Sequence, residues 1–211
     1  MHVRRINMGA AIVASGLAVA ALFGTTGQAE AQVRAGIEAG MAYRSSTPKL
    51  DPGLAAGAHA EFKIIPMLSI GPYYLWSSLN PSDASAMAAN AVLHSWGGRI
   101  RFTLPLPDSS FRPFAYAGLG RTGIHYPGEY GAGNAYESGP LAADLTSRSG
   151  WFLEVPIGLG LGYQVQRAVQ LSADFALRPG FNFKGDAFEG EKAYDQPKMG
   201  LSLLLGAAID I

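Results

Sequence analysis

The side chains best suited to act as a general base are the histidines beyond the first 31 residues: His59, His94 and His125. A serine hydrolase needs such a base within hydrogen-bond reach of its hydroxyl group. Ser95 follows His94 directly, so in an extended chain the two would face opposite sides. Pro127 occupies the position two residues after His125, where a serine on the same face would be needed. The spacing therefore predicts no catalytic residues.

His59 shares a strand face with Glu61 but has no serine on that face. The chain contains no cysteine, and scattered histidines do not have the spacing of a metal site. The glycines Gly158, Gly160 and Gly162 alternate with apolar residues and precede no helix, so they do not form a phosphate-binding loop. We expect neither a metal nor a cofactor, and we expect no enzyme.

The first 31 residues have the layout of a secretory signal peptide. Arg4 and Arg5 precede an uncharged, mostly apolar run, Met8–Phe23, and Ala29-Glu30-Ala31 offers a cleavage site. Without this segment the net charge is −1, from 14 basic and 15 acidic residues among the 16 of each in the whole chain. Such a balance argues against nucleic acid as a partner. The expected domains are a signal peptide, 1–31, and one exported domain, 32–211.

The elements that must position the polar residues are strands. From Trp151 to Tyr163 every second residue is apolar, and the residues between them are mostly small or polar, among them Glu154. This period of two indicates a strand with one apolar face and one mixed face. The same pattern recurs in eight segments: Val33–Arg44, Leu54–Ile64, Leu68–Ser77, Val92–Leu104, Phe111–Ile124, Trp151–Tyr163, Ala168–Phe181 and Met199–Ile211.

Such segments are long enough to cross a membrane as tilted strands, which needs about 9–11 residues. The links between them alternate between short and long along the chain, as in an up-and-down barrel with short periplasmic turns and long extracellular loops. Arg121 is an exception to the pattern, because it falls on the predicted lipid-facing side of its strand. The predicted fold class is all-β: an eight-stranded antiparallel transmembrane barrel.

Aromatic side chains provide an independent test, since Trp and Tyr favour the two membrane interfaces. One set falls toward the ends of the strands that carry long loops: Tyr43, Tyr74, Trp76, Trp96, Trp151 and Phe181. A second set falls toward the short turns: Phe62, Phe102, Phe111 and Tyr163. The two sets predict two interfacial girdles.

The chain resembles the small eight-stranded outer-membrane barrels. The resemblance rests on the signal peptide, the eight strands and one sequence motif, Arg112-Pro113-Phe114-Ala115-Tyr116-Ala117-Gly118-Leu119-Gly120. That family includes the transmembrane domain of outer-membrane protein A, the X-type barrels and the opacity-type adhesins. The resemblance covers Val33–Ile211 and implies insertion into the outer membrane of a Gram-negative bacterium by the barrel insertion machinery. One departure is Ile211, because barrels of this kind usually end in an aromatic residue.

Eight strands enclose a lumen that side chains fill, so the inward polar residues should pair with one another. The predicted polar network consists of Glu38, His59, Glu61, Arg99, Arg101, Glu154, Asp174 and Arg178. Within it we expect Glu154 to pair with Arg178, and Glu38 and Glu61 to meet Arg99 and Arg101. Inward glycines are expected to make room for large inward rings such as Tyr116.

The favoured function is that of a structural or adhesin-like surface protein with a filled polar lumen. Its expected partners are outer-membrane lipid and an extracellular partner that binds loops 125–150 and 182–198. One alternative is a narrow channel or transporter for small or hydrophobic solutes, with Leu75 and Leu204 lining part of the path. In such a channel the polar network could act as a gate that opens when a salt bridge switches partners. A further alternative is a lipid A-modifying enzyme, which the resemblance allows.

Overall fold

The computed structural model describes residues 33–45, 50–81, 90–126, 148–188 and 198–211. The signal peptide and most of the two loops predicted to bind a partner lie outside these ranges. The described chain is all-β, and its strands are β1 (Val33–Arg44), β2 (Leu50–Ile65), β3 (Leu68–Pro81), β4 (Ala91–Thr103), β5 (Phe111–Tyr126), β6 (Arg148–Glu154), β7 (Ile157–Gln166), β8 (Val169–Lys184) and β9 (Met199–Asp210). None of the described residues forms a helix long and apolar enough to cross a membrane.

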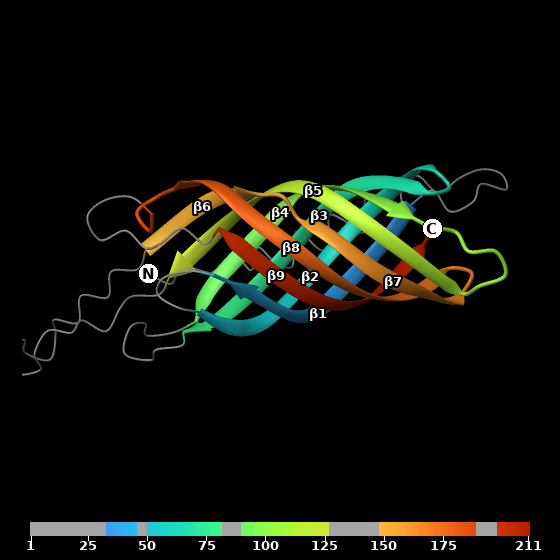
Figure 1. Cartoon of the computed structure of the whole chain (residues 1–211), viewed down its shortest axis with the longest axis horizontal. Helices are drawn as coiled ribbons and strands as arrows, with labels where there is room; N and C mark the ends of the chain where they lie inside the picture. Colours follow the sequence, from blue (N-terminus) through green and yellow to red (C-terminus); the bar gives the residue numbers. More distant parts are fainter. Residues whose placement is uncertain (1–32, 46–49, 82–89, 127–147, 189–197) are drawn as a thin grey trace, which may run out of the picture.

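All the strands pair antiparallel with their neighbours in a sheet that closes on itself (Figure 1). β1 pairs with both β2 and β9, and β4 pairs with both β3 and β5. At the closure, the Ile211 N–H donates to the Val33 carbonyl at 2.8 Å. The predicted up-and-down barrel is therefore confirmed.

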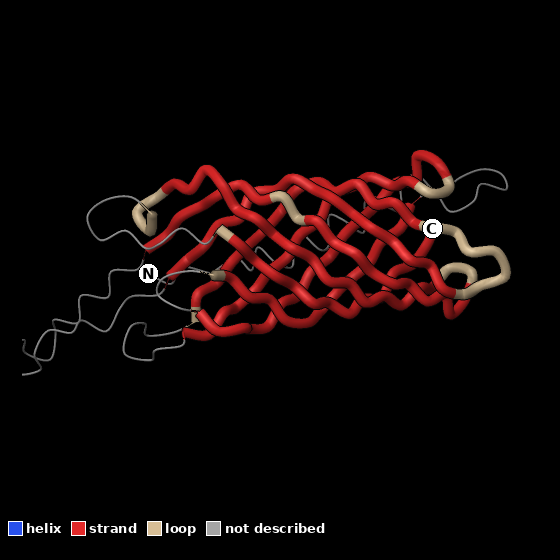
Figure 2. The backbone as a smooth tube through the Cα atoms, in the orientation of Figure 1, coloured by secondary structure: helices blue, strands red, loops and turns tan. Residues whose placement is uncertain are grey.

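β6 and β7 together occupy one position in the barrel, because both lie between β5 and β8. The sequence predicted one continuous strand here, but the structure interrupts it at Val155 and Pro156, and Figure 2 shows the interruption as a short loop. Proline lacks the N–H that a strand ladder needs. The ladder still continues on both sides, since Val155 N–H donates to the Pro179 carbonyl and Gly118 N–H to the Pro156 carbonyl, at 3.0 and 2.9 Å. Nine segments thus make eight strand positions.

The two ends of the barrel differ. The short connections β2–β3, β4–β5 and β7–β8 all lie at one end, which we call the turn end. The connections β1–β2, β3–β4, β5–β6 and β8–β9 start and finish at the opposite end, the loop end. β2 begins at Leu50 and β3 runs to Pro81, so both strands extend further toward the loop end than predicted.

Side chains alternate between the lumen and the outer face along each strand. Large apolar residues cover the outer face, and Leu159 and Leu205 are each 67% exposed. The predicted girdle residues lie on this face, for example Trp96, paired with Tyr74, and Phe111, whose ring centroid lies 5.3 Å from that of Tyr163. Buried polar residues point the other way, so the polar side chains that could form a site gather in the lumen.

Candidate functional site: the barrel lumen

The lumen contains a buried ionic cluster around Glu154, which is fully buried on β6. Its carboxylate accepts hydrogen bonds from the guanidinium groups of Arg178 on β8 and Arg44 on β1. Tyr73 on β3 donates its hydroxyl to the same carboxylate at 3.2 Å. The structure thus brings together Glu154 and Arg178, as the sequence suggested, and adds Arg44, which sequence reasoning had not connected with them. One carboxylate holds two cations, so this cluster carries a net positive charge.

A second ionic cluster surrounds Glu61 on β2. The Arg99 Nε donates to Glu61 Oε1 at 2.9 Å, and Arg101 Nη1 lies 3.8 Å from Oε2. Ser69 donates its hydroxyl to the same carboxylate at 3.1 Å. All four side chains are buried, so the pairing offsets the cost of removing these charges from water.

Glu38 links the second cluster to His59. Glu38 Oε2 lies 4.0 Å from Arg99 Nη1 and 3.6 Å from His59 Nδ1. The imidazole packs over Gly36, where an added Cβ would stand 2.6 Å from the ring. A glycine on β1 therefore provides the space that this histidine occupies.

Asp174 belongs less closely to the network than expected. Its Oδ1 accepts a hydrogen bond from the Tyr116 hydroxyl at 2.8 Å, and among the described residues no basic group lies within 4 Å of it. The rings of Tyr116 and Phe114 fit over glycines, as predicted, because a Cβ at Gly158 or Gly160 would stand 2.3 or 2.2 Å from them.

The lumen toward the loop end is apolar, which corrects the prediction of a polar lumen throughout. Residues from every strand position meet in one cluster, which we call the apolar cap: Ala42, Leu50, Ala55, Leu75, Leu79, Ala91, Leu93, Ile124, Tyr126, Phe152, Ala187, Phe188 and Leu204, with Phe183 packed against them. Leu50, Leu79 and Ala91 lie outside the predicted strands, which is why the sequence did not show that their side chains point inward. Arg44 joins the cap to the Glu154 cluster, since its guanidinium lies 4.6 Å from the centre of the Phe152 ring.

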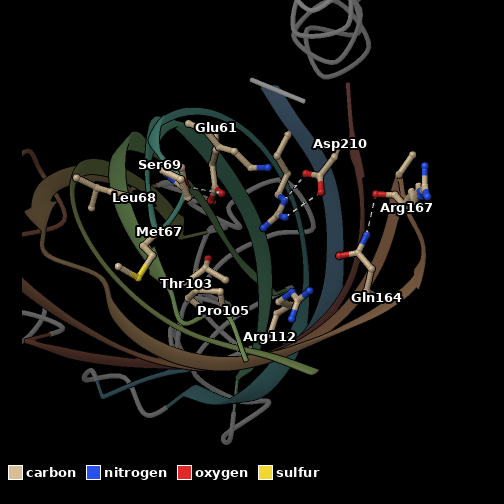
Figure 3. Close-up of a pocket in the computed structure, with 14 residues that line it drawn as sticks. Glu61, Met67, Leu68, Ser69, Thr103, Pro105, Arg112, Gln164, Arg167 and Asp210 are labelled. Atoms are coloured by element: carbon tan, nitrogen blue, oxygen red, sulfur yellow. Dashed lines mark hydrogen bonds and ion pairs between the residues drawn. The ribbon is translucent and has the colours of Figure 1, made fainter. Parts of the chain in front are cut away.

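The turn end holds a cavity of about 860 Å³, which sequence reasoning missed (Figure 3). Its lining includes the basic residues Arg34, Lys63, Arg112 and Arg167. Arg34 forms a two-point ion pair with Asp210, at 2.7 and 3.1 Å, and Arg112 donates to backbone carbonyl groups of the β4–β5 turn. The signal for this cavity was the concentration of cations near the short turns.

The outer face carries a hydrogen bond that contradicts the reasoning about His125. Its Nδ1 lies 2.9 Å from the Ser149 hydroxyl, because the register of β5 and β6 places the two residues opposite each other. Residue spacing within β5 cannot show this contact, because Ser149 lies on the neighbouring strand β6. Asp186 accepts from the Ser149 backbone N–H and, within the described chain, no carboxylate is bonded to the imidazole. The pair therefore lacks the third group that would orient a catalytic histidine.

The histidines His59 and His94 have other partners. His59 lies in the lumen beside Glu38, and His94 on the outer face has its Nδ1 2.6 Å from the Tyr74 hydroxyl. Across the described segments, no group of three or more potential ligand side chains could hold a metal ion.

No protein-family model matches the chain, and no curated protein matches it. Among solved structures, it is similar to Neisserial surface protein A, with a TM-score of 0.63 and 14% identity over 87% of this chain and 100% of that one. It is also similar to Ail, the attachment invasion locus protein of Yersinia pestis, with a TM-score of 0.52 and 9% identity over 86% of this chain and 99% of that one. The chain therefore has the fold of the small eight-stranded outer-membrane barrels, as its sequence pattern predicted.

Proposed function

We propose that this protein is an outer-membrane barrel with a closed lumen, which serves as a rigid anchor for a surface-exposed interaction site. The observation that carries the proposal is the apolar cap, because residues from all eight strand positions meet across the lumen. The Glu154 cluster lies directly against this cap. Ions would have to cross a packed apolar layer and then the Glu154 cluster, in which one carboxylate is shared by two guanidinium groups.

The outer face supports the membrane location. Exposed leucine, isoleucine and phenylalanine side chains cover it along the strands, which suits contact with lipid and not with water. The two similar structures bear the names of a surface protein and an attachment protein, which favours a surface-interaction role. In this proposal the signal peptide directs export and the insertion machinery places the barrel in the outer membrane.

A channel is the second candidate, and the cavity at the turn end favours it. This cavity gives solutes a basic vestibule on one side of the lumen. Conduction would then require the apolar cap to move aside and a salt bridge of the Glu154 cluster to exchange partners.

Bilayer recording separates the two candidates. The refolded barrel is first checked by electrophoresis of boiled and unboiled samples, since a folded barrel migrates differently from its heated chain. We expect no sustained conductance from the wild type. Phe152→Ala, which removes a fully buried ring from the cap, should increase the leak current, whereas Leu159→Ala on the outer face should not. Reproducible stepwise conductance by the wild type would overturn the closed-lumen proposal in favour of the channel.

The surface-interaction role has its own test. Cells that display the wild type are compared with cells that display a variant lacking residues 127–139, part of the β5–β6 connection. We expect the variant to fold with the same heat-dependent mobility but to lose binding to host cells or matrix. Equal binding by both would contradict the role assigned to this loop.

A further inference from the structure

Three lumen-facing side chains lie side by side at the cavity of the turn end. Lys63 of β2 stands opposite Ser69 of β3, and Ser69 stands opposite Arg101 of β4. Lys63 and Ser69 line the cavity directly (Figure 3). Because neighbouring strands are about 4.8 Å apart, the backbones of Lys63 and Arg101 are separated by roughly 10 Å. Two long cationic side chains can span that distance to meet one small ligand, with a hydroxyl group between them.

Arg101 has donors that no described residue accepts. Its side chain is buried two residues further into the barrel than Thr103, which lines the cavity. Nη1 points toward β2 and lies 3.8 Å from Glu61, the lumen-facing neighbour of Lys63, whereas Nε and Nη2 form no hydrogen bond with described residues. The guanidinium carbon lies 3.6 Å from the centre of the Phe114 ring. Such a contact holds the group in place without using its N–H donors.

A second buried polar group lies beside the same cavity. Gln170 on β8 is 1% exposed, and neither atom of its amide group forms a hydrogen bond with described residues. It stands two residues further into the barrel than Ala168, another lining residue. An added Cβ at Gly162 would stand 1.8 Å from Gln170 Nε2, and the register places Gly162 opposite Arg112. Because a buried amide without a hydrogen bond is costly, this part of the lumen favours a polar occupant.

The charges around the cavity leave a positive surplus. Four basic residues line it: Arg34, Lys63, Arg112 and Arg167. Of these, only Arg34 forms an ion pair with a described residue, Asp210. Glu61, the other acidic residue of the lining, is already paired with Arg99. Low-dielectric walls strengthen the resulting field, so the cavity favours an anion with more than one negative charge.

The cavity has room for an organic molecule as well as for a simple ion. Its volume of about 860 Å³ falls within the range of roughly 300–1,000 Å³ that is typical of small-molecule pockets. Apolar side chains in or beside the short turns form part of its lining: Pro66, Met67, Leu68 and Pro105. A fitting ligand therefore combines a charged head with an apolar body.

We propose that the cavity at the turn end binds a small phosphate monoester with an apolar body. Lys63 and Arg101 would donate to the phosphate oxygens, while the apolar body would lie against Met67 and Pro105. A phosphate monoester places both of its charges on one head, which suits two cations that reach the same point from strands two apart. In the membrane orientation proposed above, the ligand enters from the periplasm. The inference goes beyond the proposed function, because this site requires neither a conducting lumen nor the extracellular loops.

The test is a calorimetric titration of the full-length barrel, refolded in micelles of a neutral detergent, with three probes. Phenyl phosphate has both parts of the proposed ligand, phenol lacks the charge, and inorganic phosphate lacks the apolar body. The heat measured with the same micelles without protein is subtracted. We expect saturable binding of phenyl phosphate, binding of inorganic phosphate that is at least about tenfold weaker because no ring is buried, and no saturable heat from phenol.

The variants locate the site. Lys63→Gln and Arg101→Met should each weaken the binding of phenyl phosphate at least about tenfold, as the loss of one charge-assisted hydrogen bond would. Lys63→Arg keeps the charge and should bind phenyl phosphate nearly as well as the wild type. Lys184→Gln is the matched control, because it removes one cation from the loop end of β8 and should leave binding unchanged. Each variant is first shown to be folded by its heat-dependent mobility.

Three results would overturn the proposal. The first is the absence of saturable heat with phenyl phosphate. The second is undiminished binding of phenyl phosphate by both Lys63→Gln and Arg101→Met, which would place the ligand elsewhere on the barrel. The third is equal affinity for phenyl phosphate and either inorganic phosphate or phenol, which would show that the site selects only an anion or only an apolar ring. None of these results changes the outcome of bilayer recording, so the closed lumen stands or falls separately.

Discussion

Glu154→Gln is the substitution that tests most directly how the lumen is held together. Glu154 is fully buried and accepts hydrogen bonds from Arg44, Arg178 and Tyr73. Glutamine keeps the shape of the side chain but removes its charge and turns one acceptor into a donor that faces an arginine. The two guanidinium groups, each 4–5% exposed, would then share the lumen without a counter-ion.

The expected cost follows from this geometry. Removing one partner of a buried ion pair usually destabilises a protein by about 3–5 kcal/mol, because the remaining charge stays buried. Here two charges lose their partner, so we expect a loss near the upper end of that range. With a urea dependence of about 2 kcal/mol per molar, the unfolding midpoint should fall by roughly 2 M.

The assay is equilibrium unfolding in phospholipid vesicles, followed by tryptophan fluorescence and by the fraction of heat-shifted band. Asp174→Asn is the matched control, because this carboxylate is also buried but accepts from Tyr116 and has no basic group within 4 Å among the described residues. It should cost only about 1 kcal/mol. If both substitutions lower the midpoint equally, the Glu154 cluster does not carry the stability assigned to it.

Three further substitutions test other parts of the barrel by the same unfolding measurement. Gly160→Val should reduce the folded fraction sharply, since its Cβ would stand 2.2 Å from the Phe114 ring; normal refolding yield would show that the ring moves aside. Asp210→Asn should cost about 1.5–3 kcal/mol, because it weakens a two-point ion pair with Arg34 in which each side chain is only 10% exposed; an unchanged unfolding midpoint would contradict this. Arg101→Met should be neutral or stabilising by about 1 kcal/mol, because two nitrogens of this buried guanidinium make no hydrogen bond with described residues; a loss above 2 kcal/mol would contradict this.

Much of the barrel follows from the period of two. The predicted segment Val33–Arg44 coincides with β1 at both ends. The sequence predicts a turn at Asp51-Pro52-Gly53, because these residue types favour turns, and so places the start of the strand at Leu54. In the structure β2 starts four residues earlier, and these three residues form an irregularity within the strand, between Asp51 and Leu54. At Pro156 the difference is the reverse: the alternating pattern predicts that this residue lies within a strand, but the structure places it between β6 and β7. Proline has no N–H to donate to the strand ladder. The alternation of apolar and polar residues therefore predicts which face of a strand a side chain occupies more accurately than it predicts where the strand begins and ends.

The contacts between side chains of different strands depend on distances in the folded barrel, which the alternating sequence pattern does not give. Arg178 was linked to Glu154 because their strands are neighbours and both residues lie near the loop end. Arg44 reaches the same carboxylate across the lumen from β1, which follows only from the curvature and stagger of the closed barrel. The bond between His125 and Ser149 depends likewise on the register of β5 and β6, which residue spacing within one strand cannot provide.

The order of the layers explains why the two arginines beside the cap depend on Glu154. The apolar cap excludes water from the loop side of the Glu154 cluster, so an unpaired charge there would find no solvent to stabilise it. At the turn end the cavity is large enough to admit water, which can solvate Lys63, a residue that forms no ion pair within the described segments. Loss of a carboxylate should therefore cost most beside the cap, where two guanidinium groups share Glu154, and less where water can enter the cavity. This gradient assigns the cap and the Glu154 cluster to a single seal, whose two parts depend on each other.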